Sequence, residues 1–86
     1  MKLDCQRREI MPHVEIKCFP GRTEEQKQIC AEKLTEVVAE TLGCRISSVS
    51  IAIREIAEED WKTEVWDREI VPAGENLYKK PGYSYE

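Results

Sequence analysis

Two short alternating segments on either side of one helical pattern limit what this chain can fold into. Residues 13–18 alternate polar and apolar side chains, which is the period of a half-buried strand, and residues 49–54 do the same. Residues 23–42 between them carry apolar side chains at helical spacing. This order predicts a β-α-β unit with two parallel strands and a right-handed crossover. Because a two-stranded sheet is not stable alone, we expect a second copy of the chain to complete it.

The predicted helix has sequence signals at both ends. Thr23 and Gln26 form a capping-box pattern at its start, and Gly43 is the expected stop. One apolar stripe is expected along it, made of Cys30, Leu34, Val37, Val38 and Thr41.

The segment after the second strand is less regular. Residues 58–61 indicate a turn or a short helix, Pro72 is expected to interrupt the chain, and residues 73–80 have the pattern of another short helix. Both tryptophans, Trp61 and Trp66, are expected to be buried in the core, in a pocket or at an interface.

Length and composition exclude several classes of protein. The chain has 86 residues, enough for one domain, and it is 41% hydrophobic and 35% charged, as folded chains are. No apolar run approaches the roughly 20 residues of a membrane helix, and no signal peptide is present, so a soluble cytoplasmic protein is predicted. A net charge of −4 without a basic block argues against nucleic acid as a partner.

The four cysteines do not have the spacing of a metal site. Cys5, Cys18, Cys30 and Cys44 lie 12 to 14 residues apart without a C-x-x-C pair, and His13 is the only histidine. Structural zinc ligands usually come in close pairs, so neither a metal nor a cofactor is expected. We interpret the cysteines as small buried hydrophobic residues and expect self-association to stabilise so small a core.

Residues 1–11 form an extension that does not share the pattern of the remaining chain. Arg7-Arg8 can be encoded by AGG-AGG, a purine-rich ribosome-binding sequence at a suitable spacing before the codon of Met11. The hypothesis is therefore that translation starts at Met11, that this methionine is removed, and that residues 12–86 form the domain with Pro12 at its free end. The alternative is a genuine, poorly ordered arm.

From Pro12 onward the chain resembles the 4-oxalocrotonate tautomerase family. The resemblance covers residues 12–84 and rests on a proline that opens a strand, a turn, a helix start and the beginning of the second strand: Pro12, Pro20-Gly21-Arg22-Thr23, Glu24-Glu25-Gln26-Lys27 and Ser48-Val49. The tail is similar to the dimeric branch of that family in Trp66-Asp67, Glu69-Ile70 and Lys79-Lys80-Pro81-Gly82-Tyr83-Ser84. The resemblance implies an α+β protein with a β-α-β tautomerase fold. Dimerisation would complete a four-stranded sheet, and a trimer of dimers is the alternative assembly.

The resemblance also implies an isomerase that moves a proton between enol and keto forms, with Pro12 as proton acceptor and donor. A free proline nitrogen is a rigidly held secondary amine, and a nearby cation lowers the pKa of such an amine toward the operating pH. An internal Pro12 has a tertiary amide nitrogen without a basic lone pair. The competing interpretation is a non-catalytic oligomeric or protein-binding module, which gains support if the extension is retained.

Three further residues occupy family positions that contact the substrate. Arg22 matches the position that binds a carboxylate or polarises a carbonyl, and its alternative is a solvated turn arginine. Trp61 matches an aromatic that lines the pocket, and its alternative is plain packing. Ser50 stands where members acting on dicarboxylates carry a second arginine, so we expect a small 2-oxo or 2-hydroxy-enoic monocarboxylate as substrate. Arg54 lies on the same strand face as Ser50 and is the group that could compensate.

Overall fold

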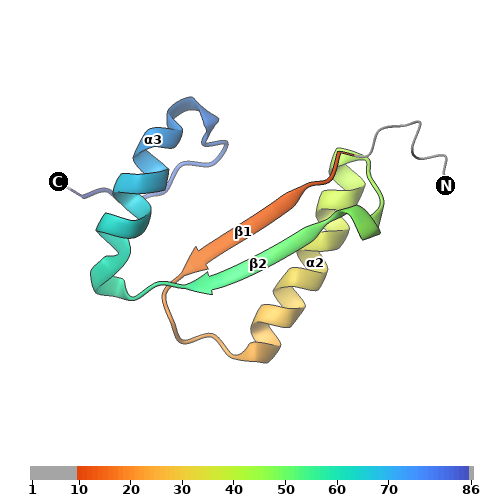
Figure 1. Cartoon of the computed structure of the whole chain (residues 1–86), viewed down its shortest axis with the longest axis horizontal. Helices are drawn as coiled ribbons and strands as arrows, with labels where there is room; N and C mark the ends of the chain where they lie inside the picture. Colours follow the sequence, from red (N-terminus) through yellow and green to blue (C-terminus); the bar gives the residue numbers. More distant parts are fainter. Residues whose placement is uncertain (1–9, 86) are drawn as a thin grey trace. The chain divides into compact units, whose positions relative to one another are not determined.

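The computed structural model describes residues 10–85 (Figure 1). The elements follow the order β1 (His13–Cys18), α2 (Glu24–Leu42), the 3-10 helix η1 (Ile46–Ser48) and β2 (Ser50–Glu55), and then a helical segment made of η2 (Glu58–Asp60), η3 (Lys62–Ile70), α3 (Val71–Ala73) and η4 (Gly74–Asn76). The predicted order of strand, helix and strand is confirmed. The described residues form two compact units, one from residues 10–16 and 21–54, the other from residues 17–20 and 55–85.

β1 and β2 form a two-stranded parallel sheet (Figure 1). The amide of Ser50 donates a hydrogen bond to the carbonyl of Pro12 at 3.1 Å, and the amide of Ile56 donates one to the carbonyl of Cys18 at 2.8 Å. The two bonds share one register, so the strands pair along their whole length. Within residues 10–85 neither strand has another neighbour, and both outer edges of the sheet are open.

Because polar and apolar side chains alternate along the strands, the sheet has one apolar and one polar face. Val14 and Ile16 are half-buried, whereas His13 and Glu15 are exposed. Within the same unit, the half-buried side chains of α2 include Leu34 and Val38. The apolar face of the sheet therefore supplies the core of this unit, and its polar face is open to solvent.

α2 begins and ends where its sequence signals predicted. The Thr23 hydroxyl accepts a hydrogen bond from the amide of Gln26 at 3.0 Å, and the Gln26 side chain accepts one from the amide of Thr23 at 2.9 Å. At the other end Gly43 has a φ of 76°, and its amide donates to the carbonyl of Ala39. Glycine adopts this left-handed conformation without a steric penalty, which is why the helix stops there.

Of the apolar stripe predicted on α2, Cys30, Val37 and Thr41 are exposed. The interpretation of Cys30 as a buried residue is therefore wrong. Cys18 and Cys44 are half-buried free thiols, and Cys5 lies outside the described residues. The stripe is broader than the surface that two strands can cover, so one side of it stays in solvent. As a result α2 contains no buried residue.

The helical segment of the second unit differs from its prediction in two places. The turn at residues 58–61 is confirmed. Pro72 does not interrupt the chain as predicted, because the helical segment continues through it. This segment ends at Asn76, and the separate short helix predicted over residues 73–80 does not form. η3 is a π-helix in which the amide of Val71 donates to the carbonyl of Trp66. The helix returns to α geometry at Pro72, which has no amide hydrogen to lose at the first turn of α3.

Burial is shallow throughout the part of the chain that the structure describes. Val65 in η3, with 5% of its surface exposed, is the buried hydrophobic residue there, and Trp61 and Trp66 are half-buried. Across residues 10–85, no helix combines the length and the apolar character that crossing a membrane requires.

Candidate functional site

Pro12 stands directly before β1 and is fixed to the neighbouring strand through its carbonyl. That oxygen accepts the 3.1 Å hydrogen bond from the amide of Ser50. The residue before it, Met11, has a φ of 52°, in the left-handed region that side chains other than glycine rarely adopt. The chain therefore makes an unfavourable turn immediately before Pro12.

Ser50 also contacts the residue after Pro12. Its hydroxyl Oγ lies 2.6 Å from Nδ1 of His13, and both side chains are on the exposed polar face of the sheet. His13 stands at a polar position of the alternating segment 13–18 and is exposed. The sequence pattern placed His13 and Ser50 on polar positions but did not indicate that they pair.

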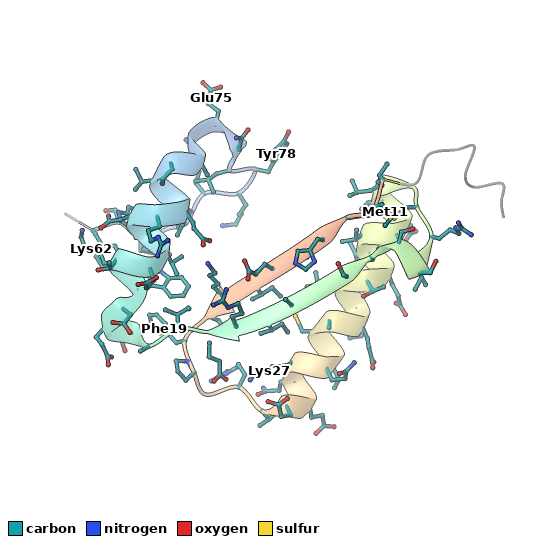
Figure 2. The ribbon with its side chains drawn as sticks, viewed as in Figure 1. Met11, Phe19, Lys27, Lys62, Glu75 and Tyr78 are labelled. Atoms are coloured by element: carbon teal, nitrogen blue, oxygen red, sulfur yellow. The ribbon has the colours of Figure 1, made fainter. Side chains whose placement is uncertain are left out.

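Arg22 lies in the connection between β1 and α2, and it is exposed. Among residues 10–85 its guanidinium forms no hydrogen bond or ion pair, and the group is available to a ligand. Arg22 and Pro12 stand beyond opposite ends of β1, whose six residues span about 20 Å. Figure 2 labels Met11 just before β1 and Phe19 just after it. One chain therefore does not bring Pro12 and Arg22 together.

Arg54 and Glu15 form an ion pair across the polar face of the sheet. The guanidinium Nη1 of Arg54 lies 3.4 Å from Oε2 of Glu15, on the strand next to it. This confirms that Arg54 shares a face with Ser50, as the alternation predicted. The pair holds Arg54 on Glu15, so in this structure its charge is already matched.

Trp61 belongs to the second unit, where other aromatic rings surround it. The ring of Phe19 meets the indole edge to face at 5.1 Å, and the indole Nε1 donates a hydrogen bond to the hydroxyl of Tyr83 at 3.1 Å. Tyr83 also packs against Trp66 at 5.5 Å, and Trp66 contacts Tyr85 at 5.4 Å. The sequence analysis did not predict that the tail packs on the tryptophans. The alternation in Tyr83-Ser84-Tyr85 is a signal for it, because it places the two tyrosine rings on the same side of the backbone.

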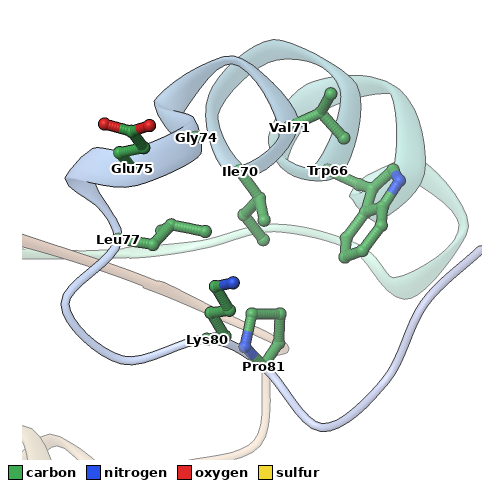
Figure 3. A pocket seen from close by; sticks show the side chains of 8 residues that line it. All are labelled: Trp66, Ile70, Val71, Gly74, Glu75, Leu77, Lys80 and Pro81. Carbon is green, nitrogen blue, oxygen red and sulfur yellow. The ribbon is translucent and has the colours of Figure 1, made fainter.

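A pocket of about 440 Å³ lies within the second unit (Figure 3). Its wall is mostly apolar, the Lys80 ammonium is directed into it, and the Glu75 carboxylate points away from it. The lining residues are Trp66, Ile70, Val71, Gly74, Glu75, Leu77, Lys80 and Pro81. None of Pro12, Arg22, Ser50 and Trp61 is among them. In the described chain no cluster of three or more histidine, cysteine or acidic side chains has the arrangement of a metal site.

The parallel β-α-β unit is similar to the fold of solved tautomerase homologues. The chain is similar to the crystal structure of YwhB, a homologue of 4-oxalocrotonate tautomerase, with a TM-score of 0.53 and 40% identity over 55% of this chain and 77% of that one. It is also similar to a 4-oxalocrotonate tautomerase isozyme from Methylibium petroleiphilum, with a TM-score of 0.54 and 38% identity over 56% of this chain and 75% of that one.

Sequence comparison leads to the same class. The chain is 49% identical to Tautomerase PptA of Enterobacter sp. (strain 638) over 75 residues, which are 86% of this chain and 99% of the relative. It is 48% identical to Tautomerase PptA of Escherichia coli (strain SMS-3-5 / SECEC) over the same shares. The family described as tautomerase enzyme matches residues 12–68. The chain belongs to this tautomerase family, and membership supports tautomerase activity in general.

Replacing Tyr83 by phenylalanine should remove the hydrogen bond to Trp61 while leaving the ring in place. The indole N–H of a tryptophan that loses an acceptor becomes more shielded, so we expect its ¹⁵N–¹H resonance to move upfield. Two-dimensional NMR of the labelled protein measures this, with the Trp61 signal assigned from Trp61→Phe.

Tyr78→Phe is the matched control, because the Tyr78 side chain is fully exposed. An unchanged Trp61 indole signal in Tyr83→Phe, or an equal shift in Tyr78→Phe, would contradict the contact.

Proposed function

We propose that the chain is an isomerase that catalyses enol–keto tautomerisation of a small 2-oxo or 2-hydroxy-enoic monocarboxylate, with Pro12 as the base. The observation that carries this proposal is that the match to the tautomerase family begins at residue 12, which is the proline at the head of β1. In the proposed reaction the Pro12 nitrogen accepts the proton of the enol hydroxyl. The protonated amine then delivers a proton to carbon, so the keto product has the same composition as the enol.

This chemistry requires Pro12 to be the first residue of the mature chain, and residues 1–11 to be absent from it. The conformation of Met11 supports such a boundary. A positive φ is unfavourable for methionine, and a residue before proline is further restricted to extended backbone. A chain that begins at Pro12 does not contain this unfavourable turn.

Arg22 is the proposed binding group for the substrate carboxylate. Its guanidinium is exposed and has no partner among the described residues, and its planar donors suit a carboxylate. Of the other candidates for a second cation site, Ser50 is neutral and Arg54 is paired with Glu15. One available cation in the proposed site supports a substrate with one carboxylate.

The active form is proposed to be a homodimer in which each site combines residues of two copies. Pro12 and Arg22 stand beyond opposite ends of β1, which is about 20 Å long, whereas a base and a carboxylate-binding group must act on one small molecule. The open edges of the sheet offer backbone groups for pairing. Exposed apolar side chains on α2 and η1 supply surface that a second copy would cover, namely Ile29, Val37, Leu42 and Ile46. Trp61 is proposed to line the same site.

One experiment can test both the absence of residues 1–11 from the mature chain and the role of Pro12 as the base. We expect the protein expressed from its own upstream region to have the intact mass of residues 12–86 and to convert a test enol to its keto form. In that form Pro12→Ala should lower kcat about 100-fold, because the remaining primary amine is a poorer and less rigid base. Mass spectrometry and an enol-depletion assay measure the two quantities.

Pro72→Ala is the matched control for this substitution, since Pro72 lies in α3 outside the proposed site, and it should keep its kcat. A mass that corresponds to residues 1–86, together with an inactive protein, would favour the binding module instead, because the Pro12 nitrogen would then be an amide.

Complementation tests whether two copies share a site. Processed Pro12→Ala and Arg22→Ala chains are each expected to be nearly inactive. After unfolding and refolding together, half of the dimers contain one of each chain, and one of their two sites has both native residues. Activity should therefore return to about a quarter of the wild-type value. If base and arginine act within one chain, the mixture stays as inactive as its components.

Substrate preference tests the assignment of a single carboxylate site. We expect kcat/KM to be higher for an aryl enolpyruvate than for a dicarboxylate dienol. Arg22→Ala should lower kcat/KM for the aryl substrate about 10- to 100-fold, the range of a lost charged hydrogen bond.

Arg68→Ala removes a guanidinium that pairs with Glu64 at 3.1 Å in η3, and it should leave kcat/KM unchanged. A clear preference for the dicarboxylate would contradict the assignment.

A further inference from the structure

We propose that Ser50 is a positioning residue that holds the proposed base in place by bonding to two successive residues at the head of β1. Its backbone amide binds the carbonyl of Pro12, and its hydroxyl binds the imidazole of His13. The inference rests on the proposed role of Pro12, and it adds the means by which a base at the end of a chain keeps a fixed position.

A base at a chain end needs such support because terminal residues fray unless they are bonded to the rest of the fold. The nitrogen of the proposed base must also stay free to exchange a proton with the substrate, so it cannot itself pair with the neighbouring strand. The carbonyl of Pro12 and the residue that follows are therefore the nearest points by which the nitrogen can be held. Ser50 binds at both of these points.

The parallel register explains why one residue reaches both. The 3.1 Å bond from the Ser50 amide to Pro12 places the serine beside the first residues of β1. The side chain of Ser50 then extends on the same face as His13, and Oγ comes within 2.6 Å of Nδ1. A serine hydroxyl can donate to an unprotonated ring nitrogen or accept from a protonated one, so the contact forms with either state of the imidazole.

A second polar pair on this face separates the proposed effect from a general effect on the sheet. Glu15 and Arg54 also join β1 to β2, at 3.4 Å, but further from Pro12. Glu15 is two residues beyond His13 on β1, and Arg54 is four residues beyond Ser50 on β2. If any cross-strand contact were sufficient, losing this pair would affect catalysis as much as losing the bond to His13. If position matters, the effect should be confined to Ser50 and His13.

The experiment compares variants of the processed protein in steady-state kinetics. We expect Ser50→Ala to lower kcat roughly three- to tenfold with little change in KM, which corresponds to the loss of one exposed hydrogen bond. Ser50→Thr keeps the hydroxyl and should retain wild-type kcat. His13→Ala should lower kcat to the same extent, and the double variant should be no worse than either single one, because all three lose the same bond.

Backbone NMR relaxation of His13 supplies a readout independent of activity. Its order parameter should fall in Ser50→Ala and recover in Ser50→Thr. Ser47→Ala, the same change at an exposed serine of η1, and Glu15→Gln, which weakens the other pair, should leave both kcat and the order parameter unchanged.

Several outcomes would overturn the proposal. These are an unchanged kcat in Ser50→Ala, an equal loss in Ser50→Thr or Glu15→Gln, or losses in Ser50→Ala and His13→Ala that multiply in the double variant. An unsubstituted processed protein without tautomerase activity would instead count against the proposed function. In that case the order parameter of His13 alone would decide whether Ser50 holds the end of the strand.

Discussion

The hydrogen bond between the amide of Ser50 and the carbonyl of Pro12 fixes the register of the parallel pair, and much of the first unit depends on it. A shift of one residue would move Val14 and Ile16 to the solvent face and His13 to the apolar face, because side chains alternate along a strand. The same shift would separate the Ser50 hydroxyl from the imidazole. Core packing and the surroundings of the proposed base are therefore consequences of one backbone alignment.

The chain leaves much of its apolar surface uncovered, and the proposed assembly follows from that fact as much as from the site. Two strands are too narrow to cover the apolar stripe of α2, so Val37 stays exposed. A second copy that covered this surface would also bring an Arg22 from outside the chain that supplies Pro12. Stability and the proposed catalysis would then both require the dimer, and a single chain would have neither the covered surface nor the complete site.

The sequence predicted the fold best where the signals are local. Thr23, Gln26 and Gly43 act on neighbouring backbone groups, and the bounds of α2 followed from them. The strands followed from an alternation that needs no knowledge of the partner strand. The errors occurred where distant packing decides, as at Cys30, whose exposure depends on how much of the helix two strands can cover.

The second unit shows the same limit. Proline usually ends a helix, but Pro72 lies in the first turn of α3, directly after the π-helix η3, and the helical segment continues through it. The contact of Trp61 with Tyr83 joins residues far apart in the chain, and periodicity carries no information about such a pair. The resemblance was enough to name the candidate site residues. It did not indicate that Pro12 and Arg22 stand beyond opposite ends of β1, which follows from the length of that strand.

A base located at the chain terminus makes the proposed activity depend on a single peptide bond. While Met11 is joined to Pro12, the proline nitrogen is an amide, and its lone pair is delocalised into the carbonyl. Neither the cap of α2 nor the pairing of β1 with β2 involves that nitrogen. These features of the fold are therefore the same whether or not Met11 is bonded to Pro12. At this one bond, the proposed catalysis would therefore have a requirement that folding does not have. A folded protein that still carries Met11 would be inactive, and the same strand pairing would hold Pro12 in a chain that begins with its free amine.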